Sequence, residues 1–197
     1  MARTLTGTVP APDVGDLLLV AAGDAAAEKR LLDRWRRPVY TVLERMLDST
    51  PAADAAAAVF EALFRSAPRF DPNASFAVRL WGLVAREAAR PPAVGVPTIP
   101  AARLRESPAA RSALLRAAVA ALPPGERAAF LLTRVARQPL PLVADALGTS
   151  EGDLRRRLAR AFEGLTLSLQ PLLNPEESGA ESDGPGDTDE GPQEAPE

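Results

Sequence analysis

Residues 122–165 have the sequence LPPGERAAFLLTRVARQPLPLVADALGTSEGDLRRRLARAFEGL, and this stretch decides the fold. Apolar residues recur in it at helical spacing in three blocks. Pro123-Pro124 predicts the start of the first block, since proline is tolerated in a first helical turn. Gln138-Pro139 precedes the second block, and Gly148 is placed to end it in a left-handed conformation. Three short helices are therefore predicted.

The third block follows a tight turn and is basic. Ser150 is predicted to cap its helix, with Asp153 three residues on in a capping-box-like position. The apolar face of this helix comprises Leu154, Leu158, Ala161 and Leu165. Mostly off that face lie Arg155, Arg156, Arg157 and Arg160. A short helix, a glycine-containing turn and a basic helix form the sequence pattern of a helix-turn-helix.

A simpler interpretation of the same stretch is a small helical bundle with a solvated, arginine-rich face. Spacing alone favours neither interpretation, because short helix-turn-helix patterns give many false positives. The concentration of arginines on the helix after the turn favours nucleic-acid binding, since it suits a groove lined by phosphates.

The composition excludes several kinds of site. The 197 residues include no cysteine and no histidine, which rules out disulfides, thiol chemistry, Cys/His zinc sites and histidine-based catalysis. We expect neither a cofactor nor a metal. No apolar run approaches the length of a membrane span and the N-terminus lacks a signal-peptide core, so a cytoplasmic location is expected.

Charge is distributed unevenly along the chain. The formal net charge of the whole sequence is −3. From Asn174 onward there are nine acidic residues and no basic ones. Residues 1–173 therefore hold 23 basic and 17 acidic residues, a net charge of +6. A basic body with an acidic tail indicates contact with nucleic acid more than the total charge does.

Helical spacing over most of the chain predicts an all-α protein with two small domains. The first domain covers residues 13–90 and contains four helices, with Asp24 and Ser75 as predicted N-caps. Pro38 lies inside the second of these helices, which it either kinks or divides. Proline-rich residues 91–108 are interpreted as a linker, residues 109–170 as a helix-turn-helix domain, and residues 171–197 as a disordered acidic tail.

This ordered series resembles the extracytoplasmic-function (ECF) class of the sigma-70 family, the bacterial transcription initiation factors. In the first domain, AAGDAAAEKRLLDRWRRPVYTVLERML is similar to the family's opening helices. The next stretch, PAADAAAAVFEALFRSAPRFDPNASFAVRLWGLVAREA, follows its core-binding and promoter-melting segments. The second domain resembles the domain that recognises the −35 promoter element. The resemblance covers most of residues 14–165.

The resemblance implies that the basic helix contacts promoter DNA. The implied contact residues are Ser150, Gly152, Arg155, Arg156, Arg157 and Arg160, whereas Leu154 and Leu158 are expected to face the core. It also implies a promoter-melting helix in which an unstacked base is captured, with Arg79, Trp81 and Arg86 as candidates. For Trp81 we favour the simpler interpretation, a tryptophan of the core.

The resemblance further implies a contact with core RNA polymerase through Asp54, Phe60, Glu61 and Phe64. The family's Asp-x-x-Gln-Glu cluster is incomplete here, because Ala57 and Ala58 occupy the Gln and Glu positions. Asp153 places a negative charge where a small polar residue is usual, and this charge would repel phosphate. The chain is therefore interpreted as a divergent member with reduced polymerase affinity or melting activity.

We expect a sigma factor that binds core RNA polymerase through residues around 51–64 and promoter DNA through the helix from Ser150. An anti-sigma factor is a further expected partner, and a membrane is not. The competing hypothesis is a degenerate regulator or decoy that binds DNA without productively engaging polymerase. An enzyme is not favoured, since neither a Gly-rich phosphate loop nor paired carboxylates form a site. The acidic tail either shields the basic helix or aids solubility.

Overall fold

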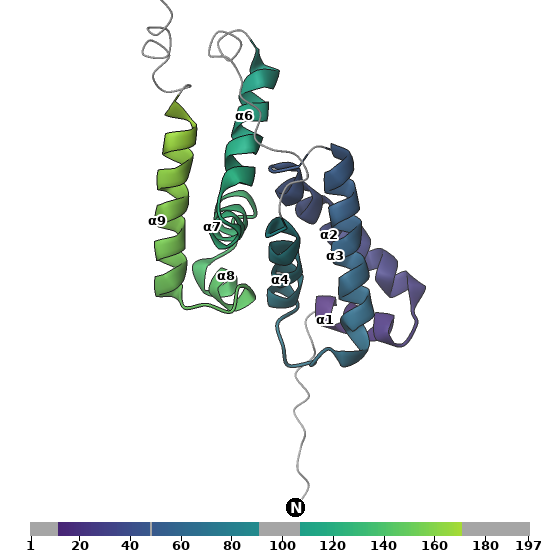
Figure 1. The fold of residues 1–197 in the computed structure, drawn as a ribbon. Coiled ribbons are helices and arrows are strands. Elements are labelled where there is room, and N and C mark those ends of the chain that lie inside the picture. The colour runs from purple at the N-terminus through teal and green to yellow at the C-terminus, as the bar shows by residue number, and fades with distance from the viewer. Residues whose placement is uncertain (1–11, 48, 91–106, 171–197) are drawn as a thin grey trace, which may run out of the picture.

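The computed structural model describes residues 12–47, 49–90 and 107–170. Every regular element in these ranges is a helix, which confirms the all-α prediction (Figure 1). The predicted linker lies almost entirely outside the described residues, and so does the predicted disordered tail. None of the described helices is both long enough and apolar enough to cross a lipid bilayer.

The N-terminal group of helices consists of α1 (Pro12–Ala21), α2 (Ala25–Glu44), α3 (Ser49–Ser66), a short 3₁₀ helix η1 (Ala67–Arg69) and α4 (Phe76–Ala88). Both predicted caps are present. The Asp24 carboxylate accepts hydrogen bonds from the backbone N–H groups of Ala26 and Ala27, at 2.8 and 3.2 Å. The Ser75 hydroxyl accepts one from Val78 at 3.3 Å. Pro38 lies within a single helix, α2, and does not divide it.

The C-terminal group consists of α6 (Pro108–Ala121), α7 (Pro124–Phe130), a π-helical stretch η2 (Leu131–Val135), α8 (Leu140–Ala146) and α9 (Glu151–Ser168). Ser107 caps α6, so Pro108 belongs to the helix and not to the linker as predicted. Gly148 has a φ of 59° and ends the turn after α8 as expected. The π-helical stretch and the positive φ of Arg137, 53°, had no signal in the sequence pattern.

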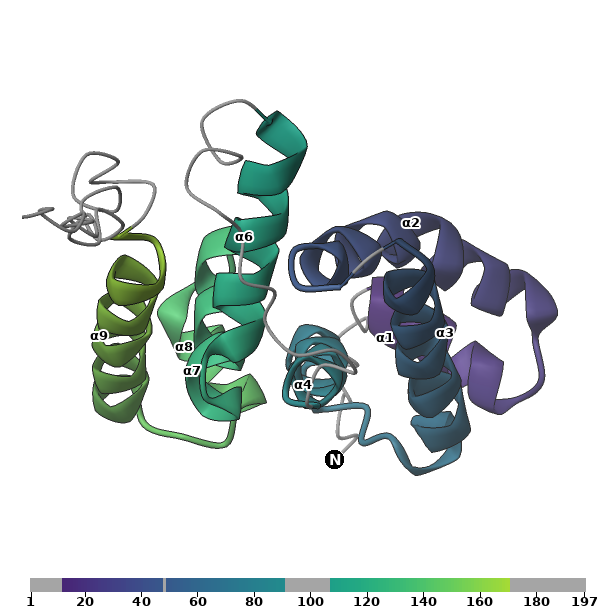
Figure 2. The ribbon, with the colours of Figure 1, turned by 45° about the horizontal axis from the view of Figure 1, so that its top comes forward.

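One hydrophobic core joins the two groups. Helix α4 lies between the rest of its own group and helices α7 and α8 (Figures 1 and 2). Fully buried side chains from both groups, such as Leu80 of α4 and Leu131 of η2, belong to one contiguous cluster. Each such leucine contributes about 2 kcal/mol by its removal from water. The fold is thus two helical groups with α4 as their common wall.

An ion-pair network fastens α1 to α2. The buried carboxylate of Asp16 accepts a hydrogen bond from Arg30 Nε at 2.9 Å and another from Arg34 Nη2 at 3.2 Å. Asp13 pairs with Arg34 and accepts a hydrogen bond from the indole of Trp35 at 3.1 Å. The hydrogen bond from Arg30 lowers the pKa of Asp16, although burial of the carboxyl opposes that shift.

Because the folded-state pKa of Asp16 lies below its unfolded-state value, its charge stabilises the protein at neutral pH, and this contribution is lost as the pH falls through the folded-state pKa. We expect Asp16→Asn to lower the free energy of unfolding at pH 7, and the difference from wild type to shrink below about pH 4. Urea unfolding of the variant and the wild type, at pH 7 and below about pH 4, measures the difference in the free energy of unfolding. Asp33→Asn, which affects only the exposed pair with Lys29, is the control. A difference independent of pH would contradict the prediction.

Candidate nucleic-acid interface

Helix α9 begins with the N-cap that the sequence predicted at Ser150, and Asp153 takes part through the Ser150 hydroxyl. The Ser150 hydroxyl accepts a hydrogen bond from the backbone N–H of Asp153 at 3.1 Å and donates one to its carboxylate at 2.7 Å. The hydrogen bond from Ser150, followed by the one from Arg156, lowers the pKa of Asp153. Asp153 therefore carries its negative charge at neutral pH, at the end of the helix where the helix dipole stabilises an anion.

The two faces of α9 are those expected from its spacing. Leu154, Leu158, Ala161 and Leu165 are buried, and the first two face the core as predicted. Ser150, Gly152, Arg155, Arg156 and Arg160 are exposed, whereas Arg157 is half-buried. The guanidinium of Arg157 lies over Gly125 of α7, where a Cβ would be 3.5 Å from its Nη1. Five of the six predicted DNA-contacting residues thus lie on the open surface.

Acidic residues already pair with three of the four arginines. Arg155 pairs with Glu151 at 2.9 Å, and Arg156 with Asp153. Arg160 pairs with Glu126 of α7 at 2.7 Å, which links the two helices. The pair with Glu151 was not predicted, although a spacing of four residues places Glu151 and Arg155 on one face of the helix. Exposed ion pairs contribute little to stability, so phosphate can replace Glu151 and Asp153 at small cost, whereas Glu126 is largely buried.

Phe162 of α9 makes two contacts that the sequence pattern did not predict. Phe162 is 40% exposed, and its ring packs edge-on against Phe130 at 5.8 Å between centroids. The guanidinium of Arg134 lies 5.0 Å from the centre of the Phe162 ring, a cation–π contact. Together with Arg155 they border a surface groove between η2, α8 and α9. Spacing placed Phe162 next to the apolar face, but only the packing of η2 shows that Arg134 reaches it.

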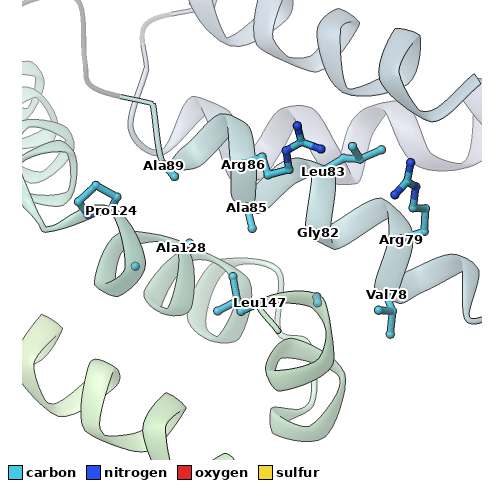
Figure 3. Close-up of a pocket in the computed structure, with 12 residues that line it drawn as sticks. Val78, Arg79, Gly82, Leu83, Ala85, Arg86, Ala89, Pro124, Ala128 and Leu147 are labelled. Atoms are coloured by element: carbon cyan, nitrogen blue, oxygen red, sulfur yellow. The ribbon is translucent and has the colours of Figure 1, made fainter. Parts of the chain in front are cut away.

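The candidates for promoter melting lie in different environments. Trp81 is 2% exposed and packs edge-on against Trp35 at 6.3 Å, so the core interpretation of this residue is correct and its ring offers no surface to a base. Arg79 and Arg86 are exposed. Arg79 Nε donates to Ser66 Oγ at 3.3 Å. Both arginines border a groove of about 430 Å³ between α4 and helices α7 and α8 (Figure 3).

The candidate polymerase contacts on α3 differ in exposure: the two acidic residues are exposed and the two phenylalanines are not. Asp54 and Glu61 are exposed, and Glu61 pairs with Arg65 at 3.6 Å. Phe60 is 4% exposed and Phe64 is half-buried, with ring centroids 6.0 Å apart. Phe60 therefore packs in the core, which contradicts its predicted role as a contact residue. Asp54 and Glu61 lie on the solvent face of α3 and are accessible to a partner.

The class of the C-terminal group follows from comparison with protein families. Residues 112–165 match the family model "Sigma-70, region 4", and this match spans most of α6 and continues into α9. The stretch of residues 122–165 thus lies entirely within the part of the chain that is similar to sigma-70 region 4. Curated protein sequences give no match to the chain.

Solved structures extend the comparison to the whole fold. Eleven chains match, including that in "Structure of CnrH in complex with the cytosolic domain of CnrY". The TM-score with CnrH is 0.62 at 21% sequence identity, over 81% of this chain and 98% of the other. The match to sigma-70 region 4 over residues 112–165 agrees with the resemblance of the second domain, and the TM-score shows that the fold as a whole is similar to that of CnrH.

The cap at Ser150 is expected to hold the start of α9 in place. Ser150→Ala removes the acceptor for the Asp153 N–H and should lower the free energy of unfolding by about 1 kcal/mol. Thr149→Ala is the matched control, since it removes a neighbouring hydroxyl that takes no part in the cap. Urea denaturation followed by circular dichroism measures both. Equal effects of the two substitutions would contradict the cap's contribution.

Proposed function

We propose that this protein is a sigma factor that binds core RNA polymerase and directs promoter-specific initiation of transcription. The observation that carries the proposal is the basic, capped helix α9 within the stretch that matches sigma-70 region 4. Its apolar face is packed against α7 and α8, which leaves Arg155, Arg156 and Arg160 on the solvent side. The role is one of binding, with no covalent chemistry, in the cytoplasm.

An anti-sigma factor is part of the same proposal. CnrH was solved in complex with the cytosolic domain of CnrY, and this chain has a similar fold. We propose that a partner protein of comparable role binds the present chain and controls its access to polymerase. The partner is to be sought among proteins that co-purify with the full chain.

For DNA, we propose that Ser150, Gly152, Arg155, Arg156, Arg157 and Arg160 form the contact surface of α9. Arg156 is the sharpest probe among them, because it is exposed and its recorded partner is Asp153 on its own helix. Arg156→Ala should weaken promoter binding and reduce the slope of log K against log salt by about 0.9, the value for one lost phosphate contact. Fluorescence anisotropy over a salt series measures both quantities.

Arg37→Ala is the matched control for this measurement, since Arg37 is an exposed arginine on α2, far along the chain from α9. It should leave the affinity and the salt slope unchanged. Weaker binding with an unchanged slope in Arg156→Ala would indicate contact with a base edge in place of phosphate. No loss of affinity in Arg156→Ala would remove this arginine from the interface.

The competing function is a DNA-binding regulator or decoy that does not productively engage polymerase. The structure gives it one specific observation: Ala57 is exposed and Ala58 half-buried on α3, so methyl groups stand where the family presents amide and carboxylate groups. Pull-down with core polymerase, followed by run-off transcription from the protein's own upstream promoter, separates the two functions. DNA binding without polymerase retention would favour the decoy.

The double substitution Ala57→Gln with Ala58→Glu tests the same surface by gain of function. If α3 contacts polymerase, restoring hydrogen-bonding side chains should tighten polymerase binding, since hydrogen bonds to charged groups contribute about 1.5–3 kcal/mol each. Ala53→Gln on the exposed surface of α3, N-terminal to the cluster, is the control. Unchanged polymerase affinity in the double variant would place the contact elsewhere.

A further inference from the structure

A groove of about 390 Å³ lies between α3 and α4 of the N-terminal group. Its charged lining consists of Glu61 and Arg65 of α3, Arg86 and Glu87 of α4, and Arg90 just after α4. Three positive charges thus face two negative ones, which leaves the groove with a net charge of +1. Because two helices supply the positive side chains, the groove favours an anion over a cation.

The ion pairs within this groove leave one arginine over. Glu61 pairs with Arg65 at 3.6 Å, and Glu87 with Arg90 at 3.1 Å. Arg86 is exposed, and no carboxylate among the residues that the structure describes forms an ion pair with it. Figure 3 shows its guanidinium directed away from α7. A carboxylate from elsewhere therefore reaches Arg86 by displacing water alone, with no internal partner to replace.

Two alanines leave room for such a carboxylate. Ala58 and Ala62 line the groove one helical turn apart on α3, and both are half-buried. The family that this chain resembles carries a glutamate where Ala58 stands. A glutamate at this position would share the groove with Arg86 and supply the missing negative charge. The substitution thus removes a carboxylate from the place where a positive charge is in excess.

The C-terminal part of the same chain is rich in carboxylates. Residues 174–197 contain nine acidic side chains and no basic one. The 27 residues from 171 to 197 span at most roughly 90 Å when extended, whereas a folded unit of the size described here has a radius of gyration of about 15 Å. Length therefore permits contact with any face of the helices, and charge selects among those faces.

Other basic surfaces offer the acidic residues less. Three of the four arginines of α9 already pair with a glutamate or an aspartate, which an incoming carboxylate would have to displace. The groove along α2 that contains Arg36 is lined by two basic and two acidic residues, so its net charge is zero. The groove between α3 and α4 combines excess positive charge, an arginine without a carboxylate partner, and space beside it.

We infer that the groove between α3 and α4 binds the acidic segment 174–197 of the same chain, with one of its carboxylates paired to Arg86. Single ion pairs at a surface are weak. Tethering compensates for this weakness, because a linked segment is present at an effective concentration in the millimolar range, where even a weak contact is largely occupied. The contact requires neither DNA nor polymerase, so it stands or falls independently of the proposed function.

The single lysine of the chain, Lys29, makes zero-length cross-linking selective. Arg86→Lys in the full chain places an amine in the groove, and a carbodiimide joins an amine to a carboxylate that touches it. Trypsin then releases residues 161–197 as one peptide, because no lysine or arginine follows Arg160. We expect mass spectrometry to find cross-links within the monomer from position 86 to residues 174–197. Their yield should fall between 0.1 and 1 M salt, as the Debye length shortens from about 10 to about 3 Å.

Arg37→Lys is the matched control, since Arg37 is an exposed arginine on α2. Cross-links to residues 174–197 should be about fivefold more abundant from position 86 than from position 37, the preference that one exposed ion pair can give. Arg156→Lys compares the face of α9 in the same way. Equal or higher yield from position 37 or 156 overturns the inference. So does the absence of these cross-links from position 86, or their presence only in a cross-linked dimer, which would assign the groove to a second copy.

A second pair of variants tests the groove itself. Ala58→Glu, combined with Arg86→Lys, supplies an internal carboxylate and should lower the yield of cross-links to residues 174–197 by about fivefold. Ala58→Gln in the same background fills the same space without charge and should lower it less. Circular dichroism checks that each variant is folded. Equal yields with glutamate, glutamine and alanine at position 58 would place the acidic segment elsewhere, and equal losses with glutamate and glutamine would contradict an ionic contact.

Discussion

The guanidinium of Arg127, enclosed by backbone carbonyls of two other helices, is the contact on which the arrangement of this protein depends. A buried cation without a carboxylate is stable only if its donors are satisfied, and here the end of α4 and the carbonyl of Ala120 satisfy them. The same bonds satisfy orphan carbonyls of α4. Cation and helix end therefore stabilise each other across 37 to 39 residues of sequence. Removal of either side leaves buried polar groups unpaired.

Helix α9 shows a different balance of forces. Its position depends on apolar packing through residues such as Leu154 and Ala161, which are fully buried, whereas its charged face adds little stability. Arg155 and Arg156 remain exchangeable because their acidic partners belong to the same helix, whereas Arg160 is held by Glu126 of α7. Such a face can give up its internal ion pairs for phosphate without disturbing the core. The proposed DNA contact and the packing that stabilises the helix thus lie on opposite sides of α9.

The departures from the sigma-70 pattern concern surfaces and not the fold. Ala57 and Ala58 alter what α3 offers to a partner, yet neighbouring Val59 and Leu63 remain fully packed. Asp153 is retained within the cap of α9, where the hydrogen bonds from Ser150 and Arg156 stabilise its charge. The repulsion of phosphate expected from Asp153 is therefore accompanied by a stabilising contribution to the cap of α9. A fold can persist through such changes because its energy resides in buried residues that they do not touch.

The sequence by itself determined the helices, their caps and the two faces of α9. These features depend on neighbours within about four residues, as at Asp24, Ser75 and Ser150, so spacing was sufficient to predict them. Tertiary structure alone decided that Phe60 is buried, that Arg134 lies on Phe162, and that Arg127 and Gly82 join α4 to the C-terminal helices. Those contacts bring together residues with no periodic relation in the chain, and their energies arise only when separate helices exclude water together.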